Sequence, residues 1–255
     1  MRLSTVYVVA LLVPTLAAAQ QSLGDWPQHS RKRPVPPIVA PGRAALPVPP
    51  PADAMVLFDG TNFAKWQDDK GGNARWHLAA GRAMEVAPGA GAMMTRDSFG
   101  DVQLHVEWAS PKPAEGNDQD RGNSGVFLMG QFEVQVLDSY HNVTYADGQA
   151  ASIYGQYPPL VNVSRAPGEW QSYDIVFHRP HFTASGTVLQ PARFTVFHNG
   201  VLVQDNVELV GPTGHMSRPP YKAGPDRLPI SLQDHAHKVR YRNIWVRDLE
   251  PVLPQ

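Results

Sequence analysis

The sequence predicts an all-β fold in which two sheets pack as a sandwich or jelly roll. Apolar and polar residues alternate in several segments between residues 52 and 250, which is the pattern of strands with one buried face. Proline is abundant, at 25 of 255 residues, and each interior proline costs a helix about 3 kcal/mol. No segment shows a long apolar repeat of 3.6 residues. Short strands with frequent turns at this chain length are typical of a sandwich.

Composition excludes several classes of function. The formal net charge is −1, so there is no electrostatic basis for a nucleic-acid partner. Cysteine is absent, which removes disulfides, thiolate metal sites, a cysteine nucleophile and a lipoprotein anchor. Hydrophobic residues make up 42% of the chain, which is enough to build a core.

Residues 1–19 have the pattern of a secretory signal peptide. Arg2 gives a charged start, residues 6–13 are mostly apolar, and Ala17, Ala18 and Ala19 form a small-residue cleavage site. The apolar run is too short to cross about 30 Å of hydrocarbon, which argues against a transmembrane anchor. We therefore expect export to the periplasm or the exterior, with no membrane span once the signal is removed.

Residues 20–51 form a proline-rich segment with eight prolines between positions 34 and 51. Such a segment is extended and has no core of its own. It is either a linker or an arm that lies along the folded domain. We favour the extended N-terminal arm, for which Trp26, Ile38 and Val39 are the expected anchors.

Strands follow from residue 52 to residue 250. In residues 101–108, four apolar side chains from Val102 to Trp108 point one way and the polar ones between them point the other way. The segment 193–204 predicts a hairpin, because Asn199 and Gly200 accept the positive φ that a type I′ turn requires. Further strands are predicted at 132–136, 173–178 and 239–247.

The strand at 132–139 carries the most informative polar residues. Glu133 and Gln135 share one face, and a β-bulge would bring Asp138 to the same face. The Glu-x-Gln-x-x-Asp array resembles the Glu-x-Asp-x-x-Glu strand of laminarinase-type glucanases, in which two carboxyl groups act about 5–5.5 Å apart. Gln135 and the shorter Asp138 depart from that pattern and disfavour ordinary hydrolysis by such a pair. The alternative is a strand with an exposed polar face.

Two other segments hold candidate residues. Gln233, His235 and His237 alternate onto one face if their strand is regular, and two histidines at this spacing can bind a metal ion. Surface or hydrogen-bonded histidines are the favoured alternative, and His235 could instead serve as a general acid or base. The loop from residue 141 to 168 combines tyrosines with amides, as a sugar-binding cleft does, or packs as an ordinary surface loop. Its members include Tyr145, Tyr154, Tyr157 and Asn162.

Several strings, taken together, resemble the 3-keto-disaccharide hydrolase domain family over residues 52–250. The resemblance implies a concanavalin A-like two-sheet jelly roll that acts on sugars already oxidised at C3. It is carried by Leu57–Trp66, Arg121–Leu128, Glu133–Tyr140, Gly168–Phe177, the hairpin at Asn199-Gly200, and Leu232–His235 with Arg242–Trp245.

The chemistry implied by this resemblance is elimination. A C3 ketone acidifies the C2 hydrogen, a base removes it, the C1 substituent leaves, and water then adds to the enone. This route needs one base and an electrophile for the enolate oxygen. Glu133 or Asp138 is the expected base, and His235 is the expected proton donor or enolate partner.

The remaining candidates are expected to bind the substrate. They are Arg121, Asn123, Gln135, Tyr157, Asn162 and Gln233. Arg121 could also polarise the ketone, and a divalent metal ion could take that role, although no clear ligand set is visible. No cofactor is expected with certainty, and no oligomeric state follows from the sequence.

Two other function classes remain open. A non-catalytic, lectin-like carbohydrate-binding module would keep the aromatic and amide contacts without a base, since a fold does not fix a function. A conventional glucanase-like hydrolase would act on unoxidised β-glucan. In all three cases the expected partner is a carbohydrate.

Overall fold

The computed structural model describes residue 20 and residues 23–249; the predicted signal peptide at residues 1–19 lies outside the described residues. The described chain is almost entirely strands and loops, with two short 3₁₀ turns, η1 (Leu23–Asp25) and η2 (Ala146–Gly148). None of its helices is long and apolar enough to cross a membrane.

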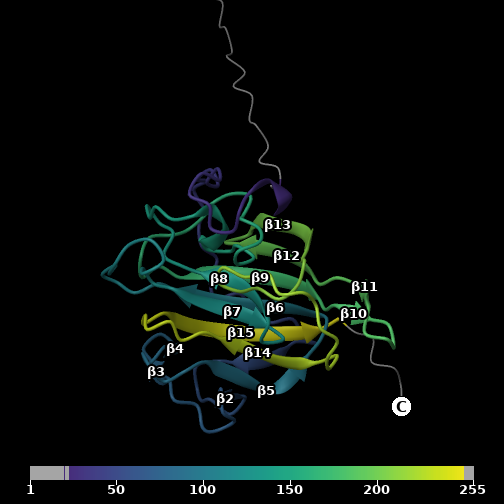
Figure 1. Ribbon diagram of the computed structural model, residues 1–255. Coiled ribbons are helices and arrows are strands. Elements are labelled where there is room, and N and C mark those ends of the chain that lie inside the picture. The colour runs from purple at the N-terminus through teal and green to yellow at the C-terminus, as the bar shows by residue number, and fades with distance from the viewer. Residues whose placement is uncertain (1–19, 21–22, 250–255) are drawn as a thin grey trace, which may run out of the picture.

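The strands form two principal sheets (Figure 1). The larger, eight-stranded sheet has the order β13-β12-β9-β6-β15-β4-β3, with β1 also paired to β15. Its strands are β1 (Met55–Phe58), β3 (His77–Ala79), β4 (Ala83–Glu85), β6 (Val102–Ala109), β9 (Gln171–His178), β12 (Arg193–His198), β13 (Val201–Glu208) and β15 (Arg240–Asp248).

The smaller, five-stranded sheet has the order β2-β5-β14-β7-β8. Its strands are β2 (Trp66–Asp68), β5 (Met93–Phe99), β7 (Ser124–Leu128), β8 (Phe132–Val136) and β14 (Leu228–Leu232). A separate ribbon pairs β10 (His181–Phe182) with β11 (Val188–Gln190). The prediction of an all-β, two-sheet jelly-roll sandwich is confirmed.

The core lies between the two sheets. The four apolar side chains of β6 from Val102 to Trp108 are fully buried, as their alternation predicts. Phe132 of β8 meets Phe177 of β9 across the interface, with ring centroids 5.5 Å apart. Burial of such side chains contributes roughly 25 cal/mol per Å² of apolar surface, which makes this interface the main source of stability.

The predicted hairpin is present between β12 and β13. Asn199 has φ of 53° and Gly200 has φ of 79°, the two positive values that a type I′ turn requires. These strands form the edge of the larger sheet, and the purple N-terminal segment lies at the same end of the molecule in Figure 1.

The outer face of β6 differs from the simple expectation of a solvated polar face. His105 and Glu107 point away from the core but are fully buried. Part of the proline-rich segment covers Glu107, because the backbone N–H of Val48 donates to Glu107 Oε1 over 2.9 Å, whereas His105 stacks on Trp245. Asn243 on β15 donates to both Val48 O and Glu107 Oε1, which joins this segment to the sheet.

The proline-rich segment packs against the domain, but its contacts are not the apolar ones expected. Ile38 is 71% exposed and Val39 41% exposed; their segment is held instead by backbone hydrogen bonds with Asn162. Trp26 is only partly buried. Arg33 of this segment is buried, at 2% exposure. Polar contacts therefore hold residues 23–51, called the arm below.

Candidate active site

A polar hollow of about 270 Å³ opens on the face of the smaller sheet that turns away from the core. Five of its lining residues are among those predicted from the sequence, and Tyr154 and His215 complete it. The full lining is Asn123, Glu133, Gln135, Tyr154, His215, Gln233 and His235. We call it the Glu133 pocket.

Regular strand pairing aims the two side chains of β8 into this pocket. Since Phe132 and Val134 face the core, the strand period of two turns Glu133 and Gln135 to the opposite side. Gln135 pairs across to Gly125 on β7. A Cβ atom at Gly125 would overlap the Glu133 carboxylate, so only glycine leaves room for that side chain.

Glu133 is a buried carboxyl group without a charged partner. The residue is 5% exposed, and no hydrogen bond or ion pair to its carboxylate is found among the described residues. Burial therefore raises the pKa of Glu133 to about 8. At pH 7 only about a tenth of such a group is ionised. The pocket thus holds a carboxyl group whose proton exchanges near neutral pH.

Three amide side chains stand around this carboxyl group. The Nε2 group of Gln135 donates to Gln119 Oε1 over 3.0 Å, and Nδ2 of Asn123 donates to Gln119 O over 2.8 Å. Gln233 follows β14, and its backbone N–H donates to Gly125 O. The Oε1 atom of Gln233 is buried without a hydrogen-bond partner, which leaves an acceptor available to a sugar hydroxyl.

Tyr154 and His215 form the opposite part of the lining. The Tyr154 hydroxyl lies 3.1 Å from Nδ1 of His215 and 2.9 Å from the hydroxyl of Tyr145. Burial raises the pKa of Tyr154, so the phenol stays protonated and can donate. Tyr154 belongs to the loop noted in the sequence, whereas His215 stands in no recognisable motif and was missed.

His235 is exposed at the mouth of the pocket. The strand expected through His235 and His237 is absent, because β14 ends at Leu232 and Ala236 has φ of 62°. The two imidazoles nevertheless stack, with centroids 5.9 Å apart. Within the described chain, no three histidine, aspartate or glutamate side chains gather as a metal-binding group, so this histidine pair has no third ligand.

The structure places Asp138 and Arg121 outside the pocket lining. Strand β8 pairs regularly with β7 and ends at Val136, so the bulge expected to return Asp138 to the Glu133 face is absent. Asp138 is 2% exposed and accepts a hydrogen bond from Arg121 Nε over 2.9 Å. Burial raises the pKa of Asp138 against the opposing effect of Arg121. The two side chains are engaged with each other.

Tyr157 and Asn162 also lie outside the pocket lining and make structural contacts. The Tyr157 hydroxyl donates to the carbonyl of Glu208 over 2.9 Å. The Nδ2 group of Asn162 donates to Ser139 O, and its backbone pairs with residues 37–39 of the arm. The expectation that these two residues contact a sugar therefore finds no support in their positions.

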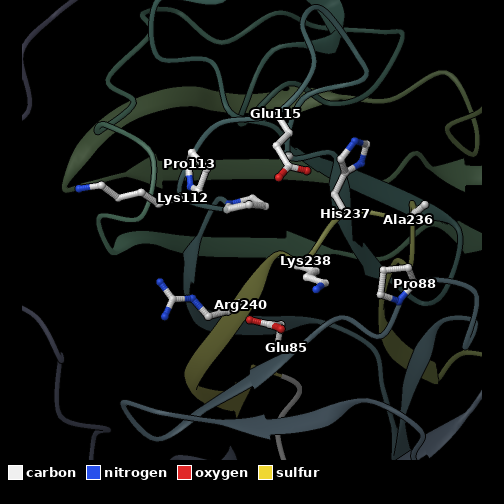
Figure 2. A pocket seen from close by; sticks show the side chains of 11 residues that line it. Glu85, Pro88, Lys112, Pro113, Glu115, Ala236, His237, Lys238 and Arg240 are labelled. Carbon is white, nitrogen blue, oxygen red and sulfur yellow. The ribbon is translucent and has the colours of Figure 1, made fainter.

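A second hollow, of about 440 Å³, is lined by residues that neighbour those of the Glu133 pocket in sequence (Figure 2). Gly122 lines it next to Asn123 of the first pocket, and His237 lines it two residues after His235. Figure 2 shows charged side chains of both signs around it, including Glu85, Glu115, Lys112, Lys238 and Arg240. The two hollows have no lining residue in common, but the same two chain segments contribute to both.

Fold and pocket together define a carbohydrate-active protein of the glycosyl hydrolase type. A β-sandwich whose outer face carries amides, a tyrosine, histidines and one carboxyl group offers the donors and acceptors that sugar hydroxyls require. Residues 53–247 match a family described as the 3-keto-alpha-glucoside-1,2-lyase-like domain, and the chain belongs to this family. The family resemblance seen in the sequence is thereby confirmed.

Solved structures agree with this assignment. A crystal structure of a candidate glycosyl hydrolase from Parabacteroides distasonis ATCC 8503 is 42% identical, with a TM-score of 0.77, and the match covers 85% of this chain and 93% of that one. A second candidate glycosyl hydrolase from the same organism is 17% identical, with a TM-score of 0.57 and coverage of 78% and 94%, and shows the fold alone. No curated protein matches the chain.

Proposed function

We propose that the protein cleaves 3-keto-glycosides by elimination followed by hydration, with Glu133 as the base. The observation that carries this proposal is the Glu133 carboxyl group, which is buried, has no hydrogen-bond or charged partner in the described part of the chain, and has a pKa raised to about 8. A carboxylate with a raised pKa is a stronger base than an ordinary one, and a pKa near the working pH suits general base catalysis. Membership of the lyase-like family supports the same chemistry.

In the first step, the Glu133 carboxylate takes the C2 hydrogen as a proton, and the electron pair moves to the C3 oxygen as an enolate. The Tyr154 hydroxyl, which lies 3.1 Å from His215 Nδ1, is placed to donate to that oxygen. The C3 ketone then re-forms, a double bond forms between C1 and C2, and the C1–O bond breaks. His235 protonates the leaving oxygen.

In the second step, water adds at C1 and a proton returns to C2, which completes a net hydrolysis. Asn123, Gln135 and Gln233 bind hydroxyl groups throughout. Arg121 and Asp138 have no part in this scheme, because they bind each other outside the pocket lining.

The test is product analysis in deuterated water with a 3-keto-disaccharide. Elimination predicts one deuterium at C2 of the released sugar, because the returning proton comes from solvent. Release of a monosaccharide without deuterium at C2 would contradict the elimination route.

A conventional two-carboxyl glucanase is disfavoured by the lining of the Glu133 pocket. Glu133 is the one carboxyl residue among the seven residues that line this pocket, whereas both retaining and inverting enzymes of the usual type use a pair of carboxyl groups. Release of reducing sugar from laminarin would overturn this interpretation.

The amide-rich lining also fits a lectin-like module, which is the second candidate. Such a module would bind the same 3-keto-sugar without turnover. Calorimetric titration together with a product assay separates the two, because an enzyme consumes the ligand during the titration.

We also propose that the protein is exported, on the basis of the signal-peptide pattern in residues 1–19. Fractionation of producing cells tests this, and a full-length, uncleaved chain in the cytoplasm would contradict it.

A further inference from the structure

The arm reaches the rear of the Glu133 pocket through His29. The His29 ring centroid lies 4.2 Å from that of Tyr145, 5.0 Å from that of Tyr154 and 5.2 Å from that of His215. Tyr154 and His215 line the pocket on their other side. A residue far earlier in the chain therefore packs against two side chains that line the pocket.

His29 is itself held in place by Asp147 in η2. The backbone N–H of His29 donates to Asp147 Oδ2 over 3.0 Å, and its ring Nδ1 lies 3.5 Å from Oδ1. Burial alone would raise the pKa of Asp147, but the contacts with His29 and the charge of Arg33 lower it, so Asp147 is ionised. His29 has φ of 59°, a left-handed conformation that a non-glycine residue keeps only where its surroundings enforce it.

Neighbouring arm residues fix the two chain segments that carry Tyr154 and His215. Gln28 Nε2 donates to the carbonyl of Gly214, immediately before His215. Gln28 also fills the space beside Gly155, where a Cβ atom would overlap its amide. Arg33 Nη1 donates to Gln156 O over 3.2 Å and lies 3.8 Å from Asp147 Oδ2.

We propose that the arm is a working part of the site, in which His29 is a positioning residue that fixes the Tyr154–His215 pair. The family match begins only at residue 53, so the arm lies outside the domain that defines the family. Small displacements of catalytic groups cost large factors in rate, and groups held by supporting side chains keep their geometry. The kinetic part of this inference rests on the proposed function, whereas the positional part does not.

The test uses His29→Ala and His29→Phe in the full chain, with His77→Ala as the control. His77 is an exposed histidine on β3 and touches neither the arm nor the pocket lining. The first readout is the ¹⁵N and ¹H spectrum of the His215 imidazole, which needs no substrate. The second is kcat and KM with a 3-keto-disaccharide.

We expect both His29 variants to shift the His215 imidazole signals and His29→Ala to lower kcat roughly 10- to 100-fold. His29→Phe keeps an aromatic ring in place and should retain more activity, with a smaller effect on the melting temperature. His77→Ala should change none of these readouts.

An unchanged His215 spectrum in a folded His29 variant would overturn the proposal, as would a lower melting temperature with kcat and KM kept within twofold. If His29→Ala fails to fold, Gln28→Ala is measured in the same way: it removes the hydrogen bond to Gly214 and the contact beside Gly155, and an unchanged His215 spectrum would again overturn the proposal. A shifted His215 spectrum in a protein without turnover would support the positioning role and refute the proposed function separately.

Discussion

Glu133 and Glu107 are both buried glutamates on strands, yet their carboxyl groups have opposite surroundings. Glu107 accepts hydrogen bonds from Arg242 Nε over 2.7 Å, from Asn243 Nδ2 over 2.8 Å and from the backbone of Val48 over 2.9 Å. Burial alone would raise the pKa of Glu107, but these bonds lower it below the ordinary value. Among the described residues, Glu133 has no such partner, and burial raises its pKa to about 8.

The difference in pKa indicates a structural role for the Glu107 carboxylate and a functional role for the Glu133 carboxyl group. A buried charge is costly unless it is paired, and the paired Glu107 contributes to the contact between the arm and the larger sheet. An unpaired buried carboxyl group is retained at a cost in stability, and perturbed groups of this kind concentrate at functional sites. Burial is common to both residues, so the missing partner is what marks Glu133.

The largest expected effect comes from exchanging each carboxyl group for an amide. Glu133→Gln should lower kcat/KM for a 3-keto-disaccharide by 10²- to 10⁴-fold, the usual contribution of a general base. Its fold should be preserved, because the amide has nearly the shape of the protonated carboxyl group. Steady-state kinetics and thermal unfolding measure the two effects.

Glu107→Gln is the matched control, with the opposite outcome. Removing the charge leaves Arg242 without its buried partner, so the free energy of unfolding should fall by about 3 kcal/mol. The kcat/KM value of the folded fraction should stay within about twofold of the wild type. Equal kinetic losses in the two variants would remove the distinction between them.

A second effect tests the space around Glu133. Gly125→Ala places a methyl group against the Glu133 carboxylate and should lower kcat/KM roughly 10- to 100-fold. Gly224→Ala is the control, because no atom lies within 4 Å of its added Cβ. Unchanged kinetics in Gly125→Ala would show that the carboxylate moves without consequence.

The pH dependence of the rate has a definite sign. A base with a pKa of about 8 must lose its proton before it acts, so kcat/KM should rise about tenfold from pH 6 to pH 7. A profile that does not rise between pH 6 and pH 7 would contradict Glu133 as the base. The rise should be absent in Glu133→Gln.

The last prediction concerns the dependence of stability on pH. The pKa of Glu133 in the folded protein lies above its ordinary value of 4.5, so the folded state keeps a proton that the unfolded chain loses. This contribution is complete below pH 4.5 and is lost as pH rises towards 8, by at most about 1.4 kcal/mol per pH unit. For Glu107 the sign is reversed, and its contribution is lost as pH falls below 4.5.

Urea unfolding from pH 4 to pH 8 measures both trends. Glu133→Gln should remove the decline towards pH 8, and Glu107→Gln should reduce the loss at acid pH. A Glu133→Gln variant with the wild-type slope would contradict the unpaired state of Glu133.

The fold could be predicted because strand alternation reports burial directly. Val102 to Trp108 are buried as expected, and the hairpin turn follows from the φ preferences of Asn199 and Gly200. The same period of two brought Glu133 and Gln135 to one face. The sequence was therefore sufficient to predict the structure wherever residues close together in the chain determine the geometry.

The site residues that the sequence did not predict correctly lie where the geometry depends on segments far away in the chain. Asp138 required a bulge that regular pairing with β7 does not contain. His215 joins the pocket only through the folding of its loop against Tyr154, and no sequence motif announces that contact. The burial of Glu107 depends on the arm, which an alternating strand pattern cannot reveal.

The hydrogen bond from Val48 to Glu107 limits how far the chain can be truncated at its N-terminal end. A version trimmed to residues 53–247 would lose that donor together with Gln28, His29 and Arg33. It would expose Glu107 on the outer face of β6, and Tyr154 and His215 of the Glu133 pocket would lose their contacts with His29. We therefore expect a stable piece of the protein to need residues that precede the family match at residue 53, and engineering or grafting should start before residue 28.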